Sequence, residues 1–135
     1  MPADLVLELP ATTSGLHECL ARIEEICRAR NLPRDTIARL RIVAEELFSN
    51  TIGHGHGGES DRPIHIRLRC SPPVALVYED TGPPFDPTGW QEPSPAAGPS
   101  RGELGRKGIA LVLGLAASAR YERLPGGNRM TIEFA

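Results

Sequence analysis

The order in which helical and strand-like patterns follow one another is the feature that most constrains the fold of this chain. Alternating and helically spaced apolar residues predict a strand, two helices, two strands, a helix and two strands, over residues 5–9, 13–30, 33–53, 64–70, 74–78, 109–117, 119–123 and 129–134. Helices and strands therefore come in blocks. This order favours an α+β fold, a two-layer α/β sandwich with a mixed sheet covered by helices on one face, over a doubly wound parallel sheet.

One irregular segment interrupts these blocks. The 135 residues include 14 glycines and 13 prolines, and these residues are concentrated between Gly82 and Gly108. The remainder reads as ordinary globular sequence, so we expect a single domain over 1–135 that contains one long loop. Near the end of the chain, the run 125–128 (Pro-Gly-Gly-Asn) predicts a hairpin between the last two strands.

Charge and cysteine content exclude several classes of protein. The net charge is −2, from 15 basic and 17 acidic side chains, which argues against a dedicated nucleic-acid binder. The 3 cysteines are not closely spaced and indicate neither a disulfide framework nor a zinc site. The first ten residues lack a secretory leader, and no stretch is long and apolar enough for a membrane span, so we expect a cytoplasmic protein without a membrane partner.

Two segments carry carboxylates in places where they can do chemistry. Glu46 and Asn50 lie four residues apart on the second predicted helix, where they can hold a hard cation or position a hydroxyl, or simply form an exposed helix edge. Asp80 ends an apolar strand just before Gly82, a position that suits recognition of an exocyclic amine. Taken alone, Asp80 is better interpreted as a turn residue that caps its own backbone.

A third segment, residues 102–108, brings glycines and two basic residues to the start of the helix predicted at 109–117. Exposed N–H groups at a helix start, with positive charge beside them, can bind phosphate. The spacing is that of neither a Walker A loop nor a dinucleotide-binding fingerprint. His54 and His56 in the preceding glycine cluster can be a metal pair, the floor of a nucleotide pocket or part of an exposed loop.

The three segments together resemble the N, G1 and G2 boxes of the GHKL ATPases. The run Ala-Glu-Glu-Leu-Phe-Ser-Asn-Thr-Ile-Gly-His-Gly at 44–55 is similar to that of the small bacterial anti-sigma-factor serine kinases. The resemblance extends over nearly the whole chain. It implies a Bergerat-type ATP-binding fold, with magnesium ATP held between helices and sheet under a flexible lid at about 86–107.

The resemblance also implies roles for individual residues. Glu46 would be the general base toward a serine hydroxyl, Asn50 the magnesium ligand, and Asp80 the acceptor for the adenine amino group, with Thr131 behind it through a water. The full set of residues implied to bind ATP is Asn50, His54, Asp80, Gly82, Phe85, Gly105, Lys107, Gly108, Ile109 and Thr131.

The implied partner is an anti-sigma antagonist of the STAS type, phosphorylated in a partner-switching pathway. The resemblance also implies a homodimer, and it leaves open whether a sigma factor is bound.

Two departures from the family pattern are Arg106-Lys107 in the lid and Pro84 after the first glycine. The altered lid keeps open a second hypothesis, an ATP- or ADP-binding switch without phosphate transfer. An ATPase module of a larger assembly is a weaker third.

Overall fold

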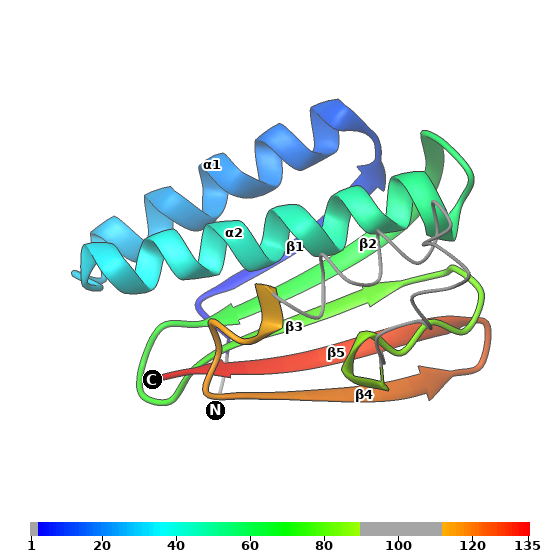
Figure 1. The fold of residues 1–135 in the computed structure, drawn as a ribbon. Coiled ribbons are helices and arrows are strands. Elements are labelled where there is room, and N and C mark those ends of the chain that lie inside the picture. The colour runs from blue at the N-terminus through cyan, green and yellow to red at the C-terminus, as the bar shows by residue number, and fades with distance from the viewer. Residues whose placement is uncertain (1–2, 90–111) are drawn as a thin grey trace, which may run out of the picture.

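The computed structural model describes residues 3–89 and 112–135, and the chain builds a sheet with two long helices on one face (Figure 1). The strands and helices are, in order, β1 (Leu5–Ala11), α1 (Thr13–Ala29), α2 (Arg34–Asn50), the short π-helix η1 (Thr51–Gly55), β2 (Ser60–Arg69), β3 (Val74–Asp80), the 3-10 turn η2 (Pro87–Gly89), β4 (Ser118–Leu124) and β5 (Gly127–Phe134).

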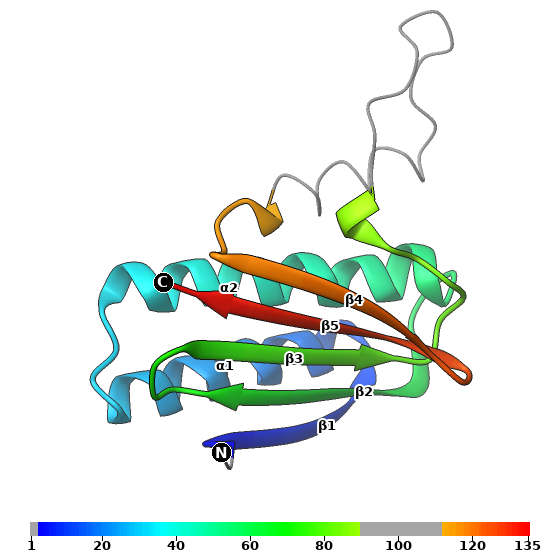
Figure 2. The same ribbon diagram turned by 90° about the horizontal axis from the view of Figure 1, so that it is seen from below.

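The five strands lie in the order β1-β2-β3-β5-β4 (Figure 2), and every pairing is antiparallel. The α+β sandwich is confirmed, whereas the expectation of a mixed sheet is wrong. The reason lies in the connections: α1 and α2 run in opposite directions, so the chain returns from β1 to β2 antiparallel rather than through a single crossover helix.

The core lies between the helices and one face of the sheet. Along β2, alternate residues from Ile64 to Leu68 are buried, along β3 the consecutive residues 74–76 are all buried, and on the helices the largest fully buried side chain is Phe48. The predicted alternation of β2 is therefore confirmed. Cys19 and Cys27 are also completely buried, as expected of core residues, and burial raises the pKa of each thiol to about 12.

Local signals start and end the long helices where the sequence indicates. The hydroxyl of Thr12 accepts the Gly15 N–H at 2.9 Å and caps the start of α1. At the other end Asn31 adopts a left-handed conformation with φ of 59°, which breaks the helix before Pro33. Each helix then presents one apolar stripe to the sheet. None of the helices in the described part of the chain is long and apolar enough to cross a membrane.

The helix predicted at 109–117 is shorter at its end than expected. Residues 109–111 lie outside the described residues, and within 112–117 the chain is helical at Val112 and Leu113 alone. The N–H of Leu115 donates to the Val112 carbonyl at 2.9 Å, a bond over three residues that tightens the chain into a turn. Gly114 in this turn lowers the helical propensity at the same place.

The predicted hairpin joins β4 and β5 through Pro125 and Gly126, with Leu124 paired to Gly127. Gly126 has φ of 79°, the conformation that the third residue of a type II turn requires. The turn fixes the register of β4 against β5; β5 pairs separately with β3, and that register places Asn128 opposite Asp80.

Candidate active site

The site centres on Asp80, the last residue of β3. Its Oδ1 atom accepts hydrogen bonds from the Gly82 N–H at 3.1 Å and from the Asn128 side-chain amide at 2.8 Å. Its Oδ2 atom accepts from the Thr51 hydroxyl at 2.8 Å. The carboxylate is thus oriented by donors from three places, the loop after β3, the start of β5 and the end of α2.

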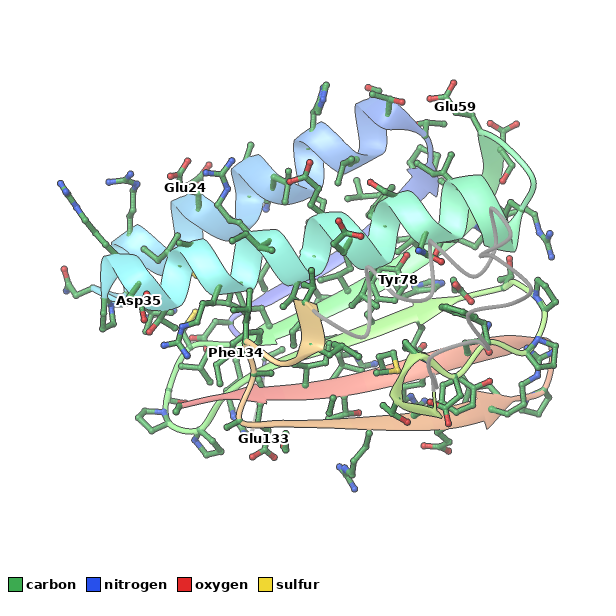
Figure 3. All side chains as sticks on the ribbon, viewed as in Figure 1. Glu24, Asp35, Glu59, Tyr78, Glu133 and Phe134 are labelled. Carbon is green, nitrogen blue, oxygen red and sulfur yellow. The ribbon has the colours of Figure 1, made fainter. Side chains whose placement is uncertain are left out.

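Thr51 connects Asp80 to the backbone of α2. Its hydroxyl lies 3.1 Å from the Leu47 carbonyl and 2.5 Å from the Tyr78 hydroxyl, and Tyr78 is also 3.1 Å from that carbonyl. Since a hydroxyl has one proton, the set is satisfied when Tyr78 donates to Thr51 or Leu47 and Thr51 donates to Asp80. Figure 3 shows Tyr78 on β3 beneath α2.

Tyr78 is a buried member of this network. Burial raises the pKa of its hydroxyl well above the ordinary value, so Tyr78 stays a neutral hydrogen-bonding group at any physiological pH. The network therefore ties the end of β3 rigidly to α2 through uncharged hydroxyls.

Glu46 and Asn50 lie on the last turn of α2, next to this network. Asn50 is buried, with 8% of its surface exposed, and Glu46 is half-buried. After Asn50 the helix widens into η1, where the N–H of His56 donates to the Thr51 carbonyl at 2.8 Å, five residues back. Such wide turns are frequent at functional sites. The amide oxygen and the carboxylate are hard donors of the type that magnesium accepts, so this end of α2 fits such an ion by its chemistry.

Asn128 is a site residue that the sequence analysis did not identify. Its amide nitrogen donates to Asp80 and to the carbonyls of Gly82 and Pro83, at 2.8, 3.3 and 2.9 Å. Its oxygen accepts from the Phe85 N–H at 3.3 Å and the Tyr121 hydroxyl at 2.5 Å. It stands opposite Asp80 in the pairing of β3 with β5, a long-range register that no local sequence pattern reveals.

Thr131 does not occupy the position expected behind Asp80. It pairs with Val77, three residues from Asp80, and side chains alternate along a strand, so Thr131 lies on the opposite face of the sheet. Figure 3 shows this alternation nearby, with Glu133 below the sheet and Phe134 on the helix side. The prediction is corrected by the register: Asn128, not Thr131, stands beside Asp80.

The loop that follows Asp80 is held in place by two arginines. Arg62 donates to the Thr81 carbonyl at 2.6 Å, and Arg123 donates to the Gly82 carbonyl at 2.8 Å. Gly82 is buried, and the half-buried Phe85 packs against the edge of the core. The structure thus brings Asp80, Gly82 and Phe85, three of the predicted site residues, into one bonded cluster.

Several predicted residues fall beyond what the structure describes. Residues 90–111 lie outside the described residues, and with them most of the predicted lid and four implied ATP-binding residues, Gly105, Lys107, Gly108 and Ile109. His54 belongs to η1, and its side chain also lies outside the described part.

Of the two histidines considered as a metal pair, only His56 has a side chain among the described residues. Among these residues no group of three or more His, Cys, Asp or Glu side chains is placed to hold a metal ion. The His56 ring instead bridges Ser60, at 3.0 Å from Nδ1, and Thr81, at 3.3 Å from Nε2. Burial, followed by the charge of Arg62, lowers the pKa of His56, with Asp80 acting in the opposite direction.

A groove with a volume of about 520 Å³ lies at the other end of the sheet. Its lining includes Cys70, which follows β2, and Val74, the first residue of β3. Asp80 is the last residue of β3, so the groove and Asp80 lie at opposite ends of this strand. None of the predicted site residues lines this groove, so we do not assign the predicted chemistry to it.

The arrangement defines a class of site. A fixed carboxylate at a strand end offers an acceptor to an amino group, and a neighbouring helix end supplies an amide oxygen and a second carboxylate. Such a site can bind a ligand that has a hydrogen-bond donor on one part and metal-bound anionic groups on another, which is the chemistry of a nucleotide.

Comparison with known proteins gives the family. Residues 9–134 match the histidine kinase-like ATPase domain, so the chain belongs to this family, and a domain of this kind implies ATP binding. Comparison with curated protein sequences gives no match.

Two solved structures share the fold. The RsbU and RsbW domains of Rv1364c from Mycobacterium tuberculosis align with 96% of this chain and 31% of theirs, at 19% identity and a TM-score of 0.68. The histidine kinase domain of the blue-light activated histidine kinase from Erythrobacter litoralis EL346 aligns with 93% of this chain and 60% of its own, at 18% identity and a TM-score of 0.51. The chain therefore spans about a third of the first structure and three fifths of the second. At these identities the likeness establishes the fold.

Proposed function

We propose that this chain is an ATP-dependent serine-protein kinase that acts as an anti-sigma-type regulator by phosphorylating an anti-sigma antagonist of the STAS type. One observation carries the proposal: the Thr51 hydroxyl, directly after the helix that bears Glu46 and Asn50, is bonded to Asp80 at 2.8 Å. The residues proposed to bind adenine and those proposed to act on the phosphates therefore belong to one site.

In this proposal Asp80 accepts a hydrogen bond from the adenine amino group, and Gly82 leaves room for the ring. Asn50 would hold magnesium together with the ATP phosphates, since magnesium usually takes few protein ligands and completes its shell with water and substrate phosphates. When bound, the ion would neutralise charge on the phosphates, and most of the catalysis of phosphoryl transfer comes from such neutralisation and from positioning. Glu46 takes the proton from the attacking serine hydroxyl.

The context of the solved neighbours supports the choice of partner. One of them contains an RsbW domain, and the sequence run at 44–55 resembles the anti-sigma-factor serine kinases. We therefore include in the proposal a homodimer in the cytoplasm whose partner is the antagonist, and a sigma factor as a further partner to be tested. Residues 86–107 are proposed, on their sequence, as the ATP lid within a single domain 1–135.

A second candidate is a switch that binds ATP or ADP and regulates a partner without transferring phosphate. The feature that favours it is the pair Arg106-Lys107 in the lid, where the family pattern has glycine. The two candidates share the nucleotide site and differ only in chemistry.

Phosphate transfer separates the two. Incubation with magnesium ATP and a candidate antagonist domain is expected to add one phosphate to the antagonist, measured as a mass shift on a serine-containing peptide. Glu46→Gln is expected to slow the transfer by about 100-fold or more, since a general base contributes roughly that much, while ATP affinity stays within about threefold. ATP binding without a mass shift on any cognate antagonist would instead support the silent switch.

A further inference from the structure

We propose that Asn128 is a positioning residue that makes the site selective for adenine, by holding the Asp80 carboxylate in one orientation. This inference rests on the proposed function, because it assumes that Asp80 reads the adenine amino group. Asn128 lies on β5, whereas Asp80 ends β3, 48 positions earlier in the chain.

The surroundings of Asn128 fix which way its amide points. Among the described residues, the partners of its Nδ2 atom are all acceptors, the Asp80 carboxylate and the carbonyls of Gly82 and Pro83. The partners that the structure describes for Oδ1 each donate to it: the N–H of Phe85, the Tyr121 hydroxyl and the Arg123 guanidinium at 3.4 Å. A rotated amide would place donors against donors and acceptors against acceptors, so the observed orientation is the satisfied one.

The orientation of Asn128 determines that of Asp80. A carboxylate has about four lone-pair positions. On Oδ1 the described donors are Gly82 N–H and Asn128, and on Oδ2 the described donor is Thr51. Oδ1 is therefore saturated, and the position left for a ligand is on Oδ2.

This geometry discriminates between purines. Adenine presents a donor at C6, which can use the Oδ2 position, whereas guanine and hypoxanthine present a carbonyl oxygen there. Two acceptors cannot pair, and the carboxylate cannot turn away without breaking its bonds to Asn128 and Thr51. A site built around a buried hydrogen-bonding partner rejects ligands that leave that partner unpaired.

Substitution of Asn128 tests the inference through a ratio of affinities. Asn128→Asp preserves size but replaces two donor hydrogens by an acceptor that faces Asp80 and two carbonyls, so the Asp80 carboxylate is pushed from its place. The dissociation constants of ATP and of purine riboside triphosphate, the same nucleotide without the 6-amino group, are measured for each variant. Their ratio reports the contact of Asp80 with the amino group and is not moved by a general loss of packing.

We expect the folded natural chain to prefer ATP over purine riboside triphosphate by about 10- to 100-fold, the usual range for a hydrogen bond to a charged group. Asp80→Asn removes this preference. Asn128→Asp reduces it by about tenfold, mainly by weakening ATP binding, while affinity for the analogue changes by less than about threefold. Asn31→Asp, the same change at an exposed asparagine, leaves the preference intact.

Two results would overturn the inference: Asn128→Asp retaining the full preference, or losing affinity for both nucleotides equally. If that variant does not fold, Asn128→Ala, which introduces no charge, is measured with the same two nucleotides and the same criteria. The proposed function fails differently, when the natural chain binds neither nucleotide. Equal binding of both by the natural chain contradicts the adenine contact at Asp80 and, with it, the inference.

Discussion

At the scale of single residues, the site depends on hydroxyl and amide groups that are bonded at both ends. The Thr51 hydroxyl links the Leu47 carbonyl, Tyr78 and Asp80 and lies in a buried position. Removing one member of such a network leaves its neighbours unpaired, which costs more than the bond itself contributes.

Thr51→Val keeps the shape of the side chain and removes the hydroxyl. We expect it to lower the free energy of unfolding by about 1–3 kcal/mol, because Asp80 and Tyr78 each lose a partner. ATP affinity should fall as well, since Asp80 is no longer held. Thr51→Ser keeps the hydroxyl and should lose about 1 kcal/mol or less. Urea unfolding measures both, and equal stabilities for the two variants would show that the hydroxyl is unimportant.

His56 gives the stability a dependence on pH. Its pKa is lowered in the folded chain from an ordinary value of 6.5, chiefly by burial and then by Arg62. The unfolded chain therefore binds more protons, so the contribution of His56 is complete above about pH 6.5 and is lost as pH falls toward the lowered value. Unfolding between pH 7.5 and 5 should be less pH-dependent in His56→Gln, with His17→Gln on the exposed face of α1 as control. An unchanged slope in His56→Gln would refute this role.

Glu46, Asn50 and Asp80 could be predicted from the sequence as site residues, whereas Asn128 could not, and the difference has a physical reason. Glu46, Asn50 and Asp80 stand out because each is a polar residue at the end of an apolar element, a local signal. Asn128 follows two glycines and reads as a turn residue, and its partners at 80–85 lie more than 40 positions away in the chain. Only strand register brings them together, and the same register carries Thr131 to the other face.

At the scale of elements, the approach of β5 to the end of β3 is the contact that forms the site. A Cβ atom on Gly127 would lie 2.1 Å from the Asp80 carbonyl oxygen, far inside van der Waals contact with backbone. The absence of a side chain at Gly127 therefore permits Asn128 to reach Asp80.

Gly127→Ala is expected to force the two strands apart. We expect a loss of about 1–3 kcal/mol in the free energy of unfolding, the usual range for overpacking a tight contact, and weaker ATP binding. Gly53→Ala is the matched control, since a Cβ atom there meets nothing within 4 Å. Chemical unfolding of both variants distinguishes them, and a Gly127→Ala protein as stable as Gly53→Ala would contradict the account of this contact.

Element boundaries were predicted well where a cap residue marks them. Thr12 and Asn31 carry such signals, and α1 begins and ends beside them, whereas β5 begins at Gly127, two residues before the strand expected at 129–134. The helix expected to reach residue 117 instead ends at Leu113, because apolar residues at 115–117 suggested a helical face while Gly114 and the short-range bonds favour a turn. Periodicity alone does not locate the end of a helix.

At the scale of the whole molecule, two helices over one face of an antiparallel sheet leave one end of the layered structure to hold the site (Figures 1 and 2). The block order of the sequence predicts this α+β architecture. The antiparallel pairing of all five strands was not predicted, because strand direction depends on how each connection returns the chain; for β1 and β2 it depends on the relative direction of α1 and α2, which no local pattern encodes.

Calorimetric titration with magnesium ATP tests the central claim most directly, that the Asp80 site binds an adenine nucleotide. We predict one ATP bound per chain, with Asp80→Asn weakening the affinity by about tenfold or more, as expected for loss of a hydrogen bond to a charged group. No binding of ATP or ADP by the natural chain, or an affinity that Asp80→Asn leaves unchanged, would contradict the account.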